Sequence, residues 1–140
     1  MRKKIFIASD HAGYDLKTKI LGLKNDNFID LGTHSSDSVD YPDYSRALTD
    51  KVVLDKNSLG ILICGSGIGM NMAANRHKNI RAALCYNIKT SKLSRMHNNA
   101  NVLILPGRFI NVHKALNCVD NFLTSDFEYG RHQARVDKLK

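Results

Sequence analysis

The residues with the clearest chemical potential lie in the stretch ILICGSGIGMNMAANRH, residues 61–77. An apolar run ends at Cys64, and Gly65, Gly67 and Gly69 follow it before a helix-forming run begins. Backbone N–H groups in such a strand-to-helix turn stabilise negative charge, either on a bound anion or on an oxygen atom during a reaction. The same surroundings lower the pKa of a neighbouring thiol, so the pattern predicts that Cys64 acts as a base or nucleophile.

Common nucleotide-binding motifs do not account for this glycine turn. A dinucleotide-binding fingerprint needs G-x-G-x-x-G after the first strand, and a P-loop ends in Gly-Lys-Ser/Thr; neither pattern is present. A structural interpretation stays open, in which Cys64 is a small buried residue and the glycines allow close packing. Cys85 and Cys118 lie in a predicted strand and a predicted helix without a glycine turn, so we expect them to be structural.

The elements that position the turn follow from five apolar stretches. These lack strict apolar–polar alternation, which is typical of parallel strands covered on both faces. The stretches are residues 3–9, 27–32, 59–65, 81–86 and 101–107. Apolar residues at helical spacing lie between and after them: Leu16, Ile20 and Leu23; Tyr44, Leu48 and Val52; and Val112, Ala115, Leu116, Val119, Phe122 and Leu123. With a last helix near residues 127–138, the order predicts an α/β fold with a doubly wound five-stranded parallel sheet and helices on both faces.

Composition narrows the class of protein. We expect residues 1–140 to form one domain, since this length can bury a sizeable core. The net charge is +8, but the lysines and arginines are spread along the chain, which argues against nucleic-acid binding. The apolar runs are far shorter than the roughly 20 residues that cross a membrane, and the N-terminus does not read as a signal peptide. The 3 cysteines form no CxxC pair, which argues against a zinc site or disulfides and predicts a cytoplasmic protein.

Five motifs occur in series along the chain. They are SDHAGYDLK from residue 9, DYPDY at 40–44, ILICGSGIGM from residue 61, SRMHNNANVL at 94–103 and GRHQARV at 130–136. Together they resemble the type B ribose-5-phosphate isomerases, a family that also contains the galactose-6-phosphate isomerase subunits. The resemblance implies a Rossmann-like fold, a homodimer or tetramer, and a reaction without metal or cofactor. The implied reaction interconverts ribose 5-phosphate and ribulose 5-phosphate through an enediol or enediolate, as in the pentose phosphate pathway.

The resemblance also implies roles for particular residues. Cys64 is the base that moves the proton, and the Ser66 hydroxyl assists the turn amides that hold the oxygens of the intermediate. His97 is the proton donor for opening the sugar ring, with Asp10 as its partner at the sugar. The implied substrate-binding residues are Asp10, His11, Tyr41, Gly65, Ser66, Gly67, Ile68, Gly69, Asn98, Arg108, Arg131 and Arg135. No residue is assigned to a metal.

Several of these residues have alternative interpretations from sequence. His97 also fits a polar residue at a helix end, and DYPDY around Tyr41 also fits a turn that leads into a helix. Arg131 and Arg135 are four residues apart, so they share one helix face that suits a phosphate, although a solvated basic tail would look the same. The function also has alternatives: an isomerase of a six-carbon phosphosugar, such as allose 6-phosphate or galactose 6-phosphate, or a non-catalytic protein that binds a sugar phosphate or nucleic acid.

The predicted fold separates two groups of these residues. Asp10 and Cys64 follow strands one and three, which we expect to be neighbours, whereas His97 and Asn98 end the helix after strand four. That helix runs back from the carboxyl edge of the sheet, so its end should lie toward the opposite edge. The resemblance accounts for this, because it implies that His97, Asn98 and Arg108 reach the site from a partner subunit.

Overall fold

A five-stranded parallel sheet forms the centre of the molecule in the computed structural model, which describes residues 3–140. The strand order is β2-β1-β3-β5-β4, and every pairing is parallel. The strands are β1 (Ile5–Ser9), β2 (Phe28–Asp30), β3 (Leu59–Cys64), β4 (Ala82–Leu84) and β5 (Val102–Pro106). This confirms the predicted doubly wound sheet, while residues 1–2 of the predicted domain lie outside the described residues.

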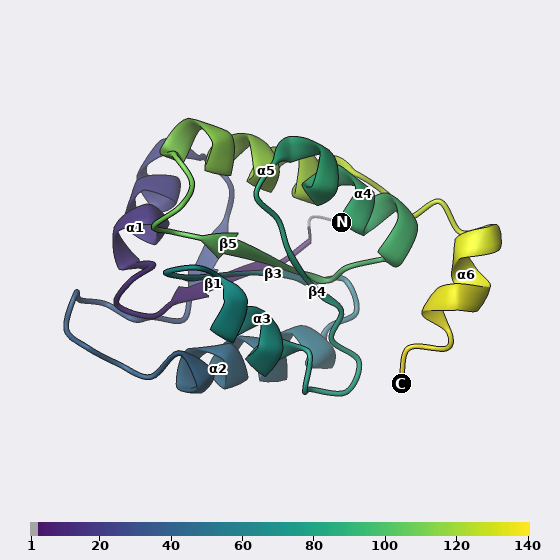
Figure 1. Ribbon diagram of the computed structural model, residues 1–140, viewed down its shortest axis with the longest axis horizontal. Coiled ribbons are helices and arrows are strands. Elements are labelled where there is room, and N and C mark those ends of the chain that lie inside the picture. The colour runs from purple at the N-terminus through teal and green to yellow at the C-terminus, as the bar shows by residue number, and fades with distance from the viewer. Residues whose placement is uncertain (1–2) are drawn as a thin grey trace.

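Helices cover both faces of the sheet (Figure 1). One face packs against α1 (Tyr14–Leu23), α4 (Ile88–Asn98) and α5 (Val112–Thr124), and the other against α2 (Tyr41–Leu54) and α3 (Ile68–Ala74). Alternate residues of the central strands enter the two cores: Ile61 and Ile63 pack on the α5 side, while Leu62 packs on the α2 side. This double burial explains why the central strands show no apolar–polar alternation.

The helices differ from the sequence predictions at two places. Leu23 was expected on the buried face of its helix, but it is 65% exposed at the last residue of α1. The final helix, α6, spans only Arg131–Val136 rather than residues 127–138. Tyr129 and Gly130 have φ values of 61° and 52°, outside the helical region, so the helix cannot begin before Arg131.

The strand order creates a switch point between β1 and β3, the place where open parallel sheets of this kind commonly bind ligands. From β1 the chain moves outward to β2 and then returns to the other side of β1, which creates a switch point at the carboxyl ends of β1 and β3. Asp10 follows β1 and Cys64 ends β3, so both lie at this switch point. Within residues 3–140, no helix is both long enough and apolar enough to span a bilayer.

Candidate active site

Cys64 is the last residue of β3 and is 5% exposed. The turn that follows leads directly into α3, with Gly67 as the residue before the first helical turn. Gly67 has a φ of 79°, and a Cβ built on it would lie 2.4 Å from Cδ1 of Leu84. Both the left-handed backbone and the close contact require glycine here. The amides of Gly67, Gly69 and Met70 thereby face the thiol sulfur of Cys64.

The pKa of Cys64 differs from the sequence prediction. Burial raises the pKa of the thiol, and the nearby carboxylate of Asp10 raises it further. The amides of Met70, Gly67 and Gly69 act in the opposite direction, as the turn pattern indicates, but burial outweighs them. The expected lowering of this pKa is therefore wrong for the ligand-free protein. At neutral pH Cys64 is mainly a thiol, and its less abundant thiolate is a strong base.

Asp10 is held beside Cys64 by the turn between β1 and α1. Its backbone N–H donates to the carbonyl of Ile63 at 3.2 Å, and its Oδ1 accepts from the N–H of Gly13 at 3.0 Å. The carboxylate is buried, with an exposed fraction of 6% for the residue. Gly13 makes this close approach possible, because a Cβ on Gly13 would lie only 2.3 Å from the carbonyl oxygen of Ile63.

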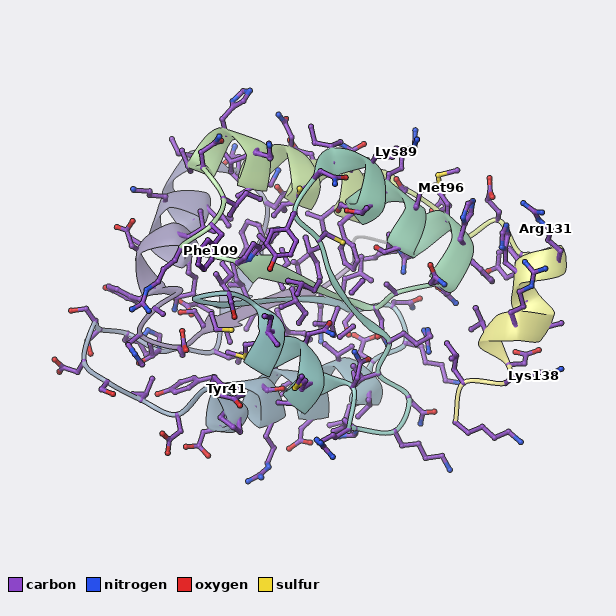
Figure 2. All side chains as sticks on the ribbon, viewed as in Figure 1. Tyr41, Lys89, Met96, Phe109, Arg131 and Lys138 are labelled. Carbon is purple, nitrogen blue, oxygen red and sulfur yellow. The ribbon has the colours of Figure 1, made fainter. Side chains whose placement is uncertain are left out.

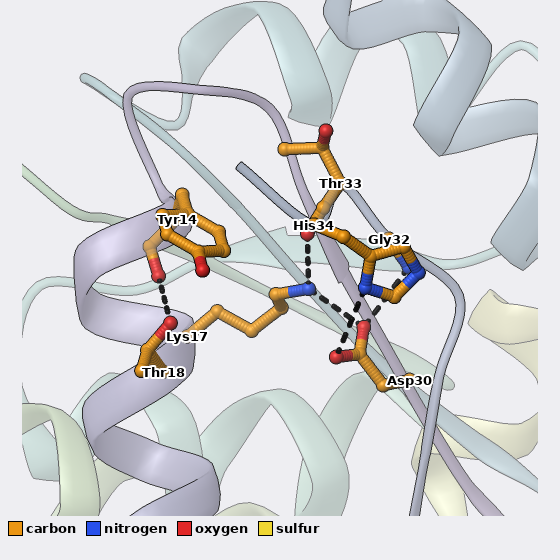
Figure 3. Close-up of polar contacts among 7 residues, drawn as sticks. All are labelled: Tyr14, Lys17, Thr18, Asp30, Gly32, Thr33 and His34. Carbon is orange, nitrogen blue, oxygen red and sulfur yellow. Dashed lines mark hydrogen bonds and ion pairs between the residues drawn. The ribbon is translucent and has the colours of Figure 1, made fainter. Parts of the chain in front are cut away.

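His11 receives its orientation from the loop after β2. Its Nδ1 accepts a hydrogen bond from the N–H of Val39 at 3.2 Å, so its proton lies on Nε2 when the ring is neutral. The start of that loop is anchored by Lys17, whose buried Nζ donates to Asp30 Oδ1 and to the carbonyl of Thr33, both at 2.6 Å (Figure 3). The imidazole ring of His11 is therefore oriented by a backbone N–H of a loop that Lys17 anchors at its start.

Tyr41 and Arg108 complete the group around the glycine turn. A Cβ on Gly69 would lie 2.6 Å from Cζ of Tyr41, which shows that the tyrosine ring lies directly over this glycine. A Cβ on Gly65 would lie 3.5 Å from Cδ and Nη1 of Arg108, and the Arg108 N–H donates to the Gly65 carbonyl at 2.9 Å. Arg108 thus contacts the turn of its own chain. The expectation that it reaches in from a partner subunit is wrong for the observed side chain.

Tyr86, which was not among the predicted site residues, contacts the turn at Ser66. Ser66 Oγ accepts from the N–H of Ile68 at 3.2 Å, so the hydroxyl lies at the start of α3. The hydroxyl of Tyr86, which follows β4, donates to the Ser66 carbonyl at 3.1 Å and ties the two loops together. The sequence position of Tyr86 just after the fourth strand could have predicted this contact, because the loops after parallel strands share one edge of the sheet.

The remaining predicted residues form a second group at the opposite end of the molecule. His97, Asn98, Arg131 and Arg135 line one pocket of about 370 Å³ between the end of α4 and α6. Figure 2 shows the separation: Arg131 on α6 and Tyr41 at the start of α2 lie at opposite sides of the view. Within one chain, His97, Asn98, Arg131 and Arg135 are thus brought together with one another, and not with Cys64.

Glu128 and His132 also belong to this second group, although neither was among the predicted site residues. The possible ligand atoms of His97, Glu128 and His132 all lie within 4.8 Å of one another. However, the two imidazole rings are stacked, with centroids 4.3 Å apart and planes 12° apart, so one metal ion cannot lie in both ring planes. The predicted absence of a metal stays a prediction, and the stack favours contacts between the side chains themselves.

Comparison with known proteins places this arrangement in a family. Residues 5–139 match the family model described as Ribose/Galactose Isomerase. The chain is 49% identical to a probable ribose-5-phosphate isomerase B of Mycoplasma genitalium, over 99% of this chain and 95% of that protein. It is 39% identical to the ribose-5-phosphate isomerase B of Escherichia coli, over 98% of this chain and 94% of that protein.

Solved structures give the same result. A ribose 5-phosphate isomerase from Thermotoga maritima superimposes with a TM-score of 0.95 at 46% identity, over 99% of this chain and 98% of that chain. The ribose-5-phosphate isomerase B of Mycoplasma genitalium with bound ribulose-5-phosphate gives a TM-score of 0.93 at 48% identity, over 99% of this chain and 95% of that chain. From its strand order, its glycine turn and these similarities together, the chain belongs to the ribose/galactose isomerase family.

Proposed function

We propose that this protein is an aldose–ketose isomerase that interconverts D-ribose 5-phosphate and D-ribulose 5-phosphate. The observation that carries the proposal is the position of the Cys64 sulfur, which faces the amides of the glycine turn beside the buried Asp10. Relatives at 39–49% identity are named ribose-5-phosphate isomerase B, and one related structure contains ribulose-5-phosphate. A place in the pentose phosphate pathway and a cytoplasmic location are part of the proposal.

The chemistry requires one base and a group of oxyanion donors. The Cys64 thiolate removes the proton from C2 of the open-chain aldose, and the electron pair of that C–H bond forms the C1=C2 bond of an enediolate. The charge moves onto O1, where the amides from Gly65 to Gly69 and the Ser66 hydroxyl stabilise it. A proton then passes from O2 to O1, the carbonyl forms at C2, and Cys64 returns its proton to C1. Oxyanion donors of this kind contribute about 3–4 kcal/mol each to transition-state stabilisation.

The substrate also needs ring opening and a phosphate site, to both of which the second group contributes. His97 donates the proton that opens the furanose ring, while Asn98 binds near the reacting oxygens. Arg131 and Arg135 lie in the same pocket, and with His11 and Arg108 they provide the cationic and N–H donors for the phosphate. Because His97 is remote from Cys64 within one chain, we infer that each active site contains the first group of one subunit and the second group of its partner.

The surface around the glycine turn supports such a dimer. Four large apolar side chains remain exposed on α3, on the loop after β4 and at the start of α4: Ile68 at 49%, Met72 at 61%, Tyr86 at 43% and Ile88 at 38%. Neighbouring exposed apolar side chains of this size commonly mark an interface. A two-fold dimer across this surface would bring the second group of each chain toward the turn of the other, twice by symmetry.

Turnover of three substrates tests the function directly. Purified protein should convert ribose 5-phosphate faster than allose 6-phosphate or galactose 6-phosphate, as measured by formation of the ketose. Preference for a six-carbon substrate would replace the pentose assignment while retaining the mechanism. No turnover of any of the three, together with phosphosugar binding, would show that the protein is a binder and not an enzyme.

A further inference from the structure

Glu128 is the only glutamate of the chain, and its backbone is fixed beside His97. Its N–H donates to the carbonyl of Met96 in the last turn of α4 at 3.0 Å. The preceding residue, Phe127, is buried, which fixes the segment from the other side. The backbone that holds the Glu128 side chain is therefore fixed next to the end of α4, although the side chain itself is 45% exposed.

The carboxylate faces both histidines of the second group. Glu128 Oε1 lies 3.4 Å from Nε2 of His97 and 3.5 Å from Nε2 of His132. The side chain of His132 is only 10% exposed, and its ring is stacked on the ring of His97 with centroids 4.3 Å apart. His97 is thus restrained by a flat, buried ring on one side and by a negative charge at its Nε2 edge.

The charges around the stack disfavour a proton on His132. Two imidazolium rings in contact would repel, since like charges at this distance disfavour each other. Burial, the neighbouring His97, and the cations of Arg131 and Arg135 lower the pKa of His132, against a smaller opposing effect of Glu128. The His132 ring therefore serves as an uncharged stacking surface for His97, while the Glu128 carboxylate lies at the Nε2 edge of His97.

We propose that Glu128 and His132 are positioning residues that hold His97 in the orientation needed to open the sugar ring, and that they affect this step alone. The proposal rests on the proposed function, because it assigns His97 to ring opening. It predicts a specific pattern: loss of either contact slows the reaction of the cyclic aldose but leaves proton transfer at Cys64 intact. A merely structural role for these residues would lower both processes together.

Two measurements on the full-length protein separate the steps. Ribose 5-phosphate is mainly a furanose closed through O4, so its net conversion requires ring opening. Ribulose 5-phosphate cannot form a five-membered ring, because O5 carries the phosphate; it is therefore an open chain. Exchange of its C1 proton with deuterium from D₂O, followed by proton NMR, then reports on Cys64 without any ring opening.

Four variants define the expected pattern. Glu128→Gln and His132→Ala should each lower kcat/KM for ribose 5-phosphate about tenfold. This is less than the roughly 10²–10⁴-fold contribution of a general acid, because His97 itself is still present. The rate of C1 exchange should stay within about twofold of wild type. His132→Phe keeps a flat stacking ring and should lose less than His132→Ala. The control Asp126→Asn removes a charge two residues from Glu128, at an exposed position, and should change neither measurement.

The outcomes distinguish this inference from the proposed function. His97→Ala should abolish net conversion and retain C1 exchange; if it lowers both equally, the ring-opening role of His97 is wrong. If His97→Ala separates the two measurements but Glu128→Gln matches wild type in both, the positioning role is wrong. The positioning role is also refuted if Glu128→Gln and His132→Ala reduce exchange as much as conversion, or if Asp126→Asn has the same effect as Glu128→Gln.

Discussion

Replacing Gly13 by alanine should damage both the fold and the active site, because Gly13 lies where α1 begins against the backbone of β3. A new Cβ would be 2.3 Å from the carbonyl oxygen of Ile63, the residue before Cys64. Even a 3.0 Å contact requires the helix start and the strand to separate by about 0.7 Å, which is costly because both contacting groups are fixed backbone. We expect a loss of about 1–3 kcal/mol in the free energy of unfolding.

The same shift should move Asp10 away from Cys64, since the Gly13 N–H binds the Asp10 carboxylate at 3.0 Å. A displacement approaching 1 Å in an active site costs about 10²-fold in rate, so kcat/KM for ribose 5-phosphate should fall by about that factor. Urea unfolding and turnover assays measure the two effects.

Gly22→Ala provides a matched control in the same helix. A Cβ on Gly22 has no neighbour within 4 Å, so this variant should keep its activity and gain up to about 1 kcal/mol of stability. Wild-type stability and turnover in Gly13→Ala would refute the reasoning, since they would mean that the turn can move without affecting Asp10.

Three further predictions concern the cysteines and metals. Cys64→Ala should abolish turnover while ligand binding persists, and Cys85→Ser and Cys118→Ser should stay within a few-fold of wild type; near-normal turnover in Cys64→Ala would exclude the thiol as the base. Burial raises the pKa of Cys118 from 9.0 to about 11, so its contribution to stability is complete below pH 9 and is lost as the pH rises through 11. Urea unfolding should show that loss as about 2–3 kcal/mol in wild type, and Cys118→Ala should lack it. Turnover should survive exhaustive chelation; loss with EDTA that one divalent ion restores would show that the enzyme needs a metal.

The sheet could be predicted from the sequence because strands buried on both faces leave a simple signal. Ile61, Leu62 and Ile63 are all apolar, since alternate side chains enter the two cores, and this run has no helical period. The turn after Cys64 was also visible, because a left-handed Gly67 packed against Leu84 admits only glycine. Both features could be predicted because they depend only on residues close in the sequence or on whether a strand is buried on both faces.

Features that depend on distant contacts were harder to predict. The pKa of Cys64 depends on a balance between burial and the turn amides, and the sequence showed only the amides. Glu128 meets His97 because the segment before α6 returns to the end of α4, a contact across about 30 residues with no periodic signal. Arg108 was misplaced because the motif around it did not indicate that it lies over Gly65 of its own chain.

The shared active site is tested most directly by mixing two inactive variants, Cys64→Ala and His97→Ala, under conditions that allow subunits to exchange. In a random dimer population half of the dimers are mixed, and each mixed dimer has one intact site out of two. A shared site therefore predicts recovery of about a quarter of wild-type turnover of ribose 5-phosphate at equal mixing. If mass spectrometry of labelled subunits demonstrates exchange and no activity returns, His97 does not complete the site of a partner subunit, and the shared-site account is contradicted.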